Sequence, residues 1–597
     1  MKTKNIFRIF ALSTVVMAGF CSCDDFLTIY PTDKTIGEEF WKTKSDVQSM
    51  VTGAYASMIS YGCQERAIVW GAFRSDELVK YSSYSSTALD NINAVNLLPT
   101  MSYNSWGDFY NVINRCNIVL NHAPEVLEID PDFTQGDYDE TRAQMLALRS
   151  LCYFYLVRAF RDVPYTTQSY EDDDQVMTVP QMSPDSVLQY CIDDLKESER
   201  YIMKSGAYGM DNWRNKGYFT RDAVRALLAD IYLWRASMTH SQSDYRECIN
   251  YADLIINSKD DYFNTINTDR IGSVLQDIYH LEERDIMFNQ IFVTGNANES
   301  ILEWQYDGVN NSNTALENYY YEEGSKENHR NYGILMASQI FNMPADNANT
   351  KQGQKLFFSK NDYRFWQNVY AVNNEEATEL AVRKFVAQSN YVNGTGSGSS
   401  NASDPTHFNQ GETKTNSRAF ENYNQNWIVY RLSDVMLMKA EALVQTATSD
   451  SDQVVMEQAF NLVQIINKRS MARTATDTLH ISDFKTKEDM ELLVLAERER
   501  ELCFEGKRWF DLMRYCYRHM EGVDIKRRLA DSEDWPALYK DMLLMVVRKY
   551  VSGGDAVSYK MKSEPYLYWP IQESECKVNR LLKQNPVFVQ EKTNQKN

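Results

Sequence analysis

The densest cluster of chemically active side chains lies at residues 497–514, where Glu and Asp alternate with Arg and Lys. Two carboxylates about 5 Å or about 6.5–9.5 Å apart could hydrolyse a glycosidic bond. That chemistry needs an acid whose pKa is raised. Here Glu497 has Arg500 three residues away and Glu501 has Arg498, and such pairing lowers a carboxylate pKa. We therefore predict a structural ion-pair network rather than a catalytic pair.

Other catalytic and metal-binding patterns are missing from the sequence. It contains no HExxH, GxSxG, phosphate-loop or Rossmann glycine motif. Residues 172–174 are all Asp but lack the alternation of an EF-hand loop, which indicates a solvated acidic loop. Seven histidines are scattered, with no two at helical ligand spacing: His122, His240, His280, His329, His407, His480 and His519. We predict no catalytic residue, no metal site and no cofactor.

Charge and aromatic content indicate what the surface recognises. Lys and Arg number 62 against 82 Asp and Glu, a formal net charge of -20, which argues against a duplex-binding surface that neutralises phosphates. The 38 Tyr outnumber the 26 Phe and 11 Trp. Tyr suits half-exposed positions, where its ring is buried and its hydroxyl finds a partner. The composition favours polar recognition surfaces.

The first residues are typical of an export signal. Basic residues precede an apolar run at residues 9–20, which is too short for a membrane-spanning helix of about 20 residues. It has the length of the apolar region of a secretory signal. Ser22 is the small residue expected before a cleavage site, and Cys23 follows it. We predict that residues 1–22 are a lipoprotein signal peptide and that Cys23 is lipidated; the alternative is an ordinary signal peptide with an incidental cysteine.

Of the ten cysteines, Cys21 and Cys23 lie in the signal region. The other eight form no CxxC pair and are scattered, several of them among apolar neighbours at helical spacing. This argues against a zinc site and favours small, buried, unpaired side chains.

Helical periodicity dominates the chain, at residues 146–160, 220–234, 245–256, 432–443, 457–466 and 492–503. A capping box beginning at Ser45 indicates a further helix start. The helices that contain Ala147, Ala226 and Ala440 combine small residues with Leu, a pattern of tetratricopeptide-like hairpins. Strand signals are few and short, as at residues 301–304. Polar stretches at 81–96, 310–330 and 393–417 are expected to be long loops, where binding usually lies.

Seven segments, in the expected order, resemble the SusD/RagB family of surface lipoproteins. They are Cys23-Asp24-Asp25-Phe26-Leu27, Phe40-Trp41-Lys42-Thr43 with Gly53-Ala54-Tyr55, Trp106…Tyr110…Ile113…Asn117, Arg149-Ser150…Tyr153-Phe154 closing at Asp162-Val163-Pro164, Tyr430-Arg431-Leu432-Ser433-Asp434-Val435, residues 497–514, and Trp569-Pro570-Ile571 with Gln584-Asn585-Pro586. The chain departs from the pattern at Arg161, where the family usually has Gly, at Gln572 and at Phe588. These departures put local turns in doubt.

The resemblance implies an all-α fold, in which tetratricopeptide-like helical hairpins carry long irregular loops and a few short strands. It implies a single domain at 23–597, with an N-terminal helical frame at about 36–260, a loop-rich ligand region at about 261–425 and C-terminal helices and tail at 426–597. It also implies a non-catalytic lipoprotein on the outer surface of the outer membrane. Such a protein binds oligosaccharides and delivers them to a SusC-type TonB-dependent transporter.

The ligand-contacting residues do not follow from the resemblance, because each family member builds its platform from its own loops. Loop position alone selects six candidates: Tyr81, Tyr84, Tyr319, Tyr320, Tyr321 and Trp366. Asp362 and Arg364 are expected to be structural, and Trp41 and Trp106 to lie in the core. Three alternatives stay open: a RagB-like protein that captures peptides, a surface glycosidase, and a structural partner of the transporter with no ligand site.

Overall fold

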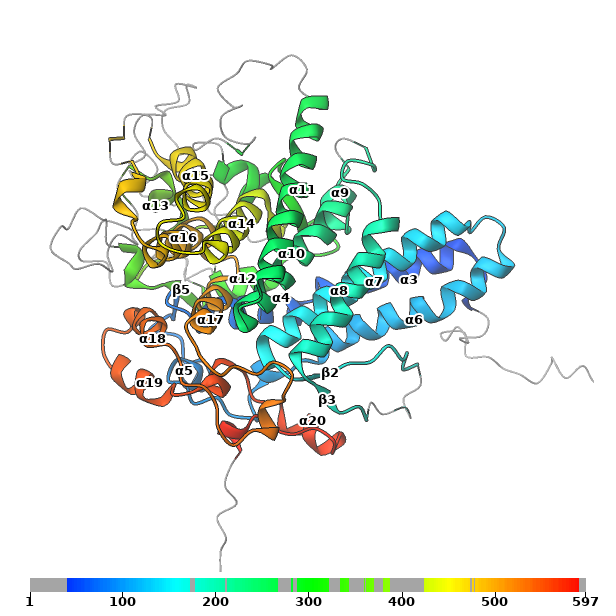
Figure 1. Ribbon diagram of the computed structural model, residues 1–597. Helices are drawn as coiled ribbons and strands as arrows, with labels where there is room; N and C mark the ends of the chain where they lie inside the picture. The colour runs from blue at the N-terminus through cyan, green and yellow to red at the C-terminus, as the bar shows by residue number, and fades with distance from the viewer. Residues whose placement is uncertain are drawn as a thin grey trace, which may run out of the picture.

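The computed structural model describes residues 40–589 except 172–174, 176–177, 210–211, 267–280, 283–286, 321–332, 343–358, 360, 370–378, 387–422, 473–474 and 477. The described chain is mostly helical with a few short strands, as the sequence predicts (Figure 1).

The N-terminal helices form the arm on the right of Figure 1. It contains α3 (Lys44–Met58), α6 (Gly107–Ile129) and α7 (Gln135–Phe160), and α3 packs along α6. The capping box of α3 differs from the prediction by two residues. Thr43 is the N-cap, because the Asp46 carboxylate accepts a 2.8 Å hydrogen bond from the Thr43 backbone N–H and the Thr43 hydroxyl accepts from Asp46 N–H.

Three helical hairpins confirm the tetratricopeptide-like pattern. They pair α7 with α8 (Pro184–Tyr201), α10 (Arg221–Thr239) with α11 (Gln242–Ile266), and α14 (Leu432–Thr446) with α15 (Gln453–Ser470). The first helix of each pair carries the small residues singled out in the sequence. Ala147, Ala226 and Ala440 are completely buried, so they let neighbouring helices approach closely. Helix α16 (Lys487–Leu502) packs against α14 and α15, and α17 (Arg508–Arg518) follows it.

The strands within the described ranges form three two-stranded antiparallel sheets. They are β1 (Leu78–Lys80) with β5 (Leu335–Ala337), β2 (Val163–Pro164) with β3 (Gln181–Met182), and β4 (Ser300–Trp304) with β6 (Trp427–Arg431). Strands β4 and β6 are buried along their whole length, so this sheet joins distant parts of the chain inside the core.

Shorter elements complete the fold. The α-helices are α4 (Tyr61–Ile68), α5 (Thr87–Asn93), α9 (Arg214–Gly217), α12 (Thr314–Tyr320), α13 (Tyr363–Asn368), α18 (Lys540–Val546), α19 (Gly554–Lys560) and α20 (Glu573–Val578). Two π-helical turns are η2 (Val69–Phe73) and η6 (Asn289–Thr294). The 3-10 turns are η3 (Ser102–Asn104), η7 (Gln339–Asn342), η10 (Ile481–Asp483), η11 (Leu529–Asp531), η12 (Val547–Lys549), η13 (Glu564–Leu567) and η14 (Pro586–Phe588).

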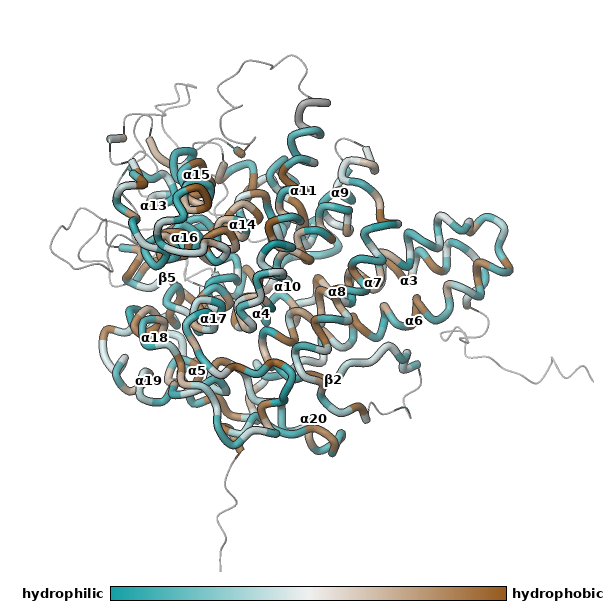
Figure 2. Tube along the Cα trace, viewed as in Figure 1, coloured by the Kyte–Doolittle hydropathy of each residue, from teal (hydrophilic) through white to brown (hydrophobic). Residues whose placement is uncertain are grey.

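Apolar residues along the helices alternate with polar ones, as the brown and teal stretches of Figure 2 show. Trp41 and Trp106 lie in the core, as predicted. The eight described cysteines are unpaired, and only Cys576 is not fully buried. None of the helices in the described ranges has both the length and the apolar character needed to cross a bilayer.

Arg161 shows how the chain accommodates a side chain where the family usually has Gly. It ends α7 with a φ of 65°, in the region that favours glycine. Its guanidinium donates to the Glu564 carboxylate at 2.8 Å and to the backbone oxygens of Asp524 and Arg527 at 2.7 Å. A strained backbone of this kind costs about 1–3 kcal/mol and persists where its surroundings hold it. Here the bonds to the C-terminal segment hold it.

Candidate functional site

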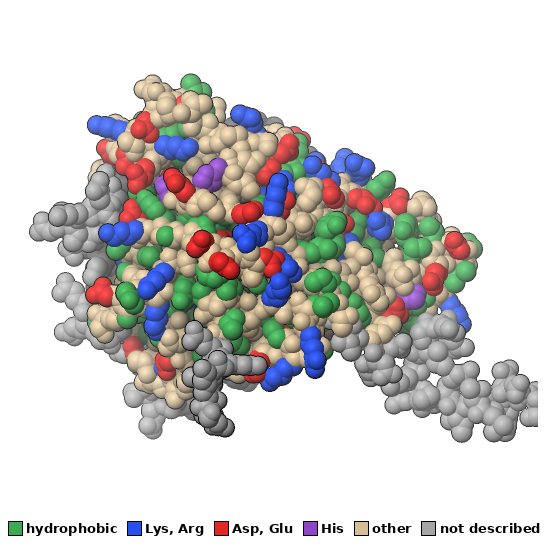
Figure 3. Space-filling view, turned by 60° about the horizontal axis from the view of Figure 1, so that its bottom comes forward, with side chains coloured by type: hydrophobic (Ala, Val, Ile, Leu, Met, Phe, Trp, Pro, Cys, Tyr) green, Lys and Arg blue, Asp and Glu red, His purple; other side chains and the backbone are tan. Residues whose placement is uncertain are grey.

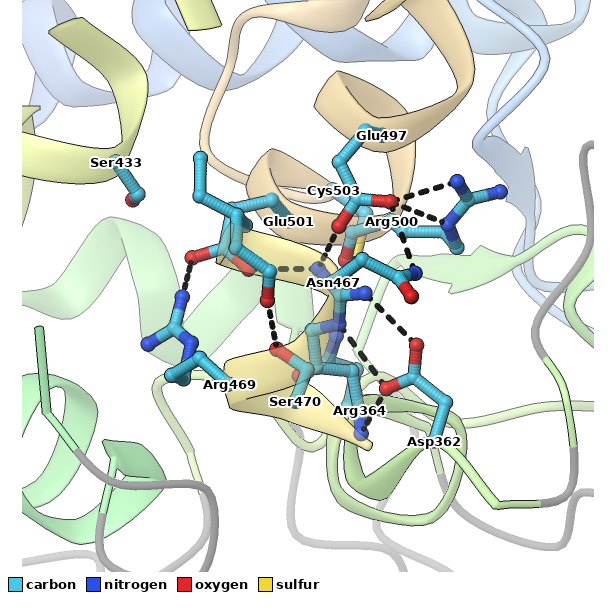
Figure 4. Close-up of polar contacts among 12 residues, drawn as sticks. Asp362, Arg364, Ser433, Asn467, Arg469, Ser470, Glu497, Arg500, Glu501 and Cys503 are labelled. Carbon is cyan, nitrogen blue, oxygen red and sulfur yellow. Dashed lines mark hydrogen bonds and ion pairs between the residues drawn. The ribbon is translucent and has the colours of Figure 1, made fainter. Parts of the chain in front are cut away.

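The charged segment at 497–514 forms a buried ion-pair network (Figure 4). Arg364 on α13 donates to Glu497 at 2.8 Å and to Glu501 at 2.7 Å, and Asp362 holds its other side at 2.8 Å. Arg500 donates to Glu497 at 2.6 Å, the pair expected from the sequence. All of these side chains are at most 5% exposed. Asp362 and Arg364 are therefore structural, as predicted.

Not every predicted pair within the segment forms. Arg498 donates to Asp434 at 3.0 Å and to Asp511 at 2.9 Å rather than to Glu501. Glu501 instead accepts from Arg364, Arg431 and Arg469, which come from other elements. The spacing of charges along one helix predicted that these carboxylates are neutralised by cations. It did not predict the cations from other elements that neutralise them.

A lowered pKa argues against general acid catalysis by some of these acids, and burial argues against it for the others. Burial alone would raise the pKa of Glu501, but Arg469, Arg431 and Arg364 hold it well below its usual value. Burial does raise the pKa of Glu499 to about 7 and that of Glu77 well above its usual value. Both residues are at most 5% exposed, so a polymeric substrate does not reach them. The segment serves folding.

Three of the six aromatic candidates, Tyr319, Tyr320 and Trp366, lie in the core, and Tyr319 is 1% exposed. The Tyr320 hydroxyl donates to the Phe504 backbone oxygen at 3.0 Å, and its side chain is completely buried. Trp366 on α13 is 4% exposed and packs edge-on against Phe365 at 4.9 Å. Their polar neighbours in the sequence suggested surface loops, whereas the structure buries all three.

The other candidates fall in different places. Tyr81 is partly buried against Met336 and Ala381, beside the β1–β5 sheet. Tyr84 lies one turn later and is also partly buried. Tyr321 and Cys23 lie outside the described residues.

Tyr84 and Tyr319 belong to one group of aromatic side chains, which we call the tyrosine cluster: Tyr61, Tyr84, Tyr103 and Tyr319, with Glu65 and Asn318. The Tyr319 hydroxyl donates to Glu65 at 2.6 Å and lies 3.1 Å from the Tyr103 hydroxyl. The Asn318 amide donates to the Tyr61 hydroxyl at 3.3 Å. The packing of α12 against α4 brings these residues together.

The members of the cluster differ in burial and influence one another electrostatically. Tyr61 is 41% exposed, Tyr84 and Tyr103 are partly buried, and Tyr319 is buried. Burial raises the pKa of Tyr103 to about 12, with smaller contributions from Glu65, Tyr61 and Tyr84. Burial, then Glu65 and Tyr103, raises the pKa of Tyr319 far above its usual value. The raised pKa values keep the Tyr61, Tyr103 and Tyr319 hydroxyls protonated at neutral pH.

Such a group can bind a neutral polar ligand without transforming it. Half-buried rings cover the apolar faces of a ligand, while hydroxyl and amide groups bond its polar substituents. Glu65 already accepts from Tyr319 and pairs with Arg66, so it is not an uncompensated acid. No group of three metal-ligating side chains occurs among the residues that the structure describes.

Sequence reasoning missed Tyr61 and Tyr103. Tyr61 begins α4, shortly after the helix that ends at Met58, so the sequence pattern indicates a buried position on a helix. Tyr103 lies in η3, in a short stretch with no repeated pattern. The surplus of Tyr over Phe was the one signal that pointed to such a cluster.

Comparisons with known sequences cover the chain in two parts. The SusD family matches residues 278–588, and a family described as "Starch-binding associating with outer membrane" matches residues 25–233. SusD-like protein P38 of Formosa agariphila is 25% identical over 86% of this chain and 92% of its own length. SusD-like protein P2 of the same organism is 21% identical over 84% of this chain and 89% of its own.

Solved structures show the same fold. A SusD homolog from Bacteroides thetaiotaomicron superposes with a TM-score of 0.65 at 16% identity, covering 92% of this chain and 99% of the other. A SusD superfamily protein from Bacteroides vulgatus gives a TM-score of 0.61 at 17% identity, covering 92% of this chain and 100% of the other. With a family match across more than half of the chain, motifs in the same order and a shared helical architecture, this protein belongs to the SusD family.

Proposed function

We propose that this protein is a cell-surface lipoprotein that binds oligosaccharides at the tyrosine cluster and delivers them to a SusC-type TonB-dependent transporter. The observation that carries the proposal is the hydrogen-bonded grouping of Tyr61, Tyr103 and Tyr319 with Asn318 and Glu65, and Tyr84 packs against the same core. Aromatic faces stack on the apolar faces of sugar rings, and the polar groups bond their hydroxyls.

The location at the outer membrane rests on sequence. Ser22 and Cys23 follow an export signal, and the match at residues 25–233 is to a family described as associating with the outer membrane. A lipid on Cys23 would tether the body to the membrane. Asp24 and Asp25 directly after it resemble the surface-export signal of such lipoproteins.

A capture role without catalysis agrees with the chemistry of the charged groups. The acids of the ion-pair network are buried, and each of Glu497, Glu501 and Glu505 lies against at least two cations. On the face in Figure 3, acidic and basic side chains are interspersed, so this face offers no continuous basic surface for nucleic acid.

Calorimetry of the mature protein against a panel of neutral oligosaccharides and a panel of peptides tests the proposal. We expect heat of binding from at least one oligosaccharide and no new reducing ends after prolonged incubation. Binding of peptides alone would support the RagB-like alternative, and shortened products would support a glycosidase. The absence of binding heat with both panels would favour a structural partner of the transporter and would contradict ligand capture.

The transporter partnership needs a separate test. Mild detergent extraction of native outer membranes, followed by affinity purification of this chain, is expected to recover a TonB-dependent barrel at equimolar amounts. The Cys23→Ala variant, expressed in the same cells, should lose its membrane association.

A further inference from the structure

A cavity of about 430 Å³ lies between α3, α7, α9 and β4, away from the buried ion-pair network. Its volume falls within the range of roughly 300–1,000 Å³ that is usual for small-molecule pockets. The loop that contains Asp307 and Asn311 forms part of its rim. None of the five aromatic candidates that the structure describes lines it.

Aromatic rings form one wall of the cavity. Tyr55 on α3 stacks on Tyr218 with ring centroids 4.5 Å apart and planes at 21°. Trp213 meets Tyr218 edge-on at 5.4 Å and 80°. Trp213 nevertheless remains 45% exposed. The array of stacked and edge-on rings therefore ends at an accessible indole.

The floor of the cavity is apolar and belongs to the rigid core. Met58 on α3, Leu148 and Leu151 on α7 and Leu302 on β4 line it, and each is at most 2% exposed. These side chains close the cavity with apolar groups and offer a ligand no hydrogen-bonding partner.

Charge at the rim restricts the ligand further. Asp307 is the one Asp, Glu, Lys or Arg among the lining residues that the structure describes. Its Oδ1 accepts from the backbone N–H groups of Val309, Asn310 and Asn311 at 2.8–2.9 Å, so it is occupied by its own loop. Among the described residues, no cation lines the cavity to compensate an anionic ligand. The Tyr218 hydroxyl makes no hydrogen bond to another residue that the structure describes, so it can bond a polar substituent.

We propose that this cavity is a second binding site, which holds an uncharged aromatic ring of the ligand. A further ring continues the stacked and edge-on array of Trp213, Tyr218 and Tyr55. Such ring pairs contribute about 0.5–1.5 kcal/mol beyond the buried area. A bare sugar ring fits less well, because its hydroxyls would face the buried Met and Leu floor. The site stands independently of sugar binding at the tyrosine cluster.

The ring could be an aryl substituent on a glycan or the side chain of a peptide, and two pairs of probes distinguish these sources. Phenyl β-glucoside is compared with methyl β-glucoside, and N-acetylphenylalanine amide with N-acetylalanine amide, by titration monitored through tryptophan fluorescence. At least one ring-bearing probe is expected to bind at least tenfold more tightly than its ring-free partner. The member that binds identifies the source.

Ala56→Phe blocks the cavity without removing a contact, because Ala56 is exposed on α3 and lines the cavity. We expect it to weaken binding of the ring-bearing probe at least tenfold. Gln48→Phe is the matched control, on the exposed surface of the same helix and outside the cavity, and should change affinity less than twofold. Unchanged thermal midpoints for both variants would show that neither disturbs folding.

Three results would overturn the proposal: equal affinity for ring-bearing and ring-free probes, no binding of either ring-bearing probe, or full binding by Ala56→Phe. Tyr61→Ala should leave affinity for the ring-bearing probe unchanged while it weakens oligosaccharide binding. A failure of sugar binding at the tyrosine cluster therefore remains distinguishable from a failure of this second site.

Discussion

Neutralising one carboxylate in the buried network should destabilise the whole fold. Glu501 accepts from three guanidiniums, those of Arg364, Arg431 and Arg469, and its side chain is completely buried. The Glu501→Gln variant keeps the size of the side chain and removes its charge. Arg364 retains Asp362 and Glu497, and Arg431 retains Glu299 and Glu505.

Arg469 loses more of its charge compensation than Arg364 or Arg431 does. Its one remaining carboxylate partner among the described residues is Glu299 at 3.4 Å, and its side chain is completely buried. Leaving a buried charge without its partner costs about 3–5 kcal/mol. With an unfolding entropy of about 2.1 cal/mol/K per residue, a loss of about 4 kcal/mol lowers Tm by about 3 °C in a chain of this length.

Glu573→Gln is the matched control, because it makes the same chemical change in an exposed pair. Glu573 and Lys577 lie 2.9 Å apart on the surface of α20, with side chains 51% and 69% exposed. Exposed helical pairs contribute about 0.3–0.5 kcal/mol. Urea unfolding followed by the fluorescence of the 11 Trp measures both variants. If Glu501→Gln lost no more stability than Glu573→Gln, the structural role of the network would be refuted.

Three further predictions follow from buried charges and thiols. Arg161→Gly relieves the strained φ but removes the bonds to Glu564, Asp524 and Arg527, so a net loss of about 2 kcal/mol is expected in the same urea assay. The free energy of unfolding should rise as the pH falls from 8 to about 5, because burial raises the folded-state pKa of Glu499 and of Glu282 to about 7. It should fall below about pH 4, because arginines lower the folded-state pKa values of Asp76, Glu441 and Glu501, which therefore take up protons as the chain unfolds. Glu499→Gln should flatten the first change, and a steady increase in stability from pH 4 to 8 would contradict this prediction. Among the described cysteines, a thiol reagent should rapidly label Cys576 alone in the folded protein, because the other seven are buried and burial raises the pKa values of Cys63 and Cys116 to about 12. All eight should react in urea. Rapid labelling of Cys63 in the folded protein would contradict its burial.

Local patterns predicted much of the helical frame. The periodicity at 220–234 begins at the N-cap of α10 and that at 432–443 falls within α14, because most residues of both helices are buried in the core. The capping box at the start of α3 was displaced by two residues, since Thr43 and Ser45 both stand before an acidic or amide side chain at cap spacing. Such signals need only residues within one turn of each other.

The site depends on contacts that no local pattern contains. Tyr319 meets Glu65 across 254 positions, and Tyr320 meets Phe504 across 184, so neighbouring tyrosines on α12 have different partners. Trp366 stands next to Phe365 in a segment that also contains Arg364 and Gln367, and it is buried through tertiary packing on α13. Trp213 also lies in a polar stretch, where nothing local indicates the cavity beside it.

Retention on a native gel that contains polysaccharide tests the central claim, ligand capture by the tyrosine cluster, most directly. The polysaccharide is the one whose oligosaccharide binds in calorimetry. The Tyr61→Ala/Tyr84→Ala variant removes two accessible rings of the cluster, whereas Tyr559→Ala removes a tyrosine that is 73% exposed elsewhere on the surface. Stacking of this kind contributes about 1 kcal/mol per ring, so the double variant should bind at least tenfold more weakly. We expect the double variant to migrate as if no polysaccharide were present, and Tyr559→Ala to be retarded like the parent. Equal retardation of the double variant and the parent would contradict it.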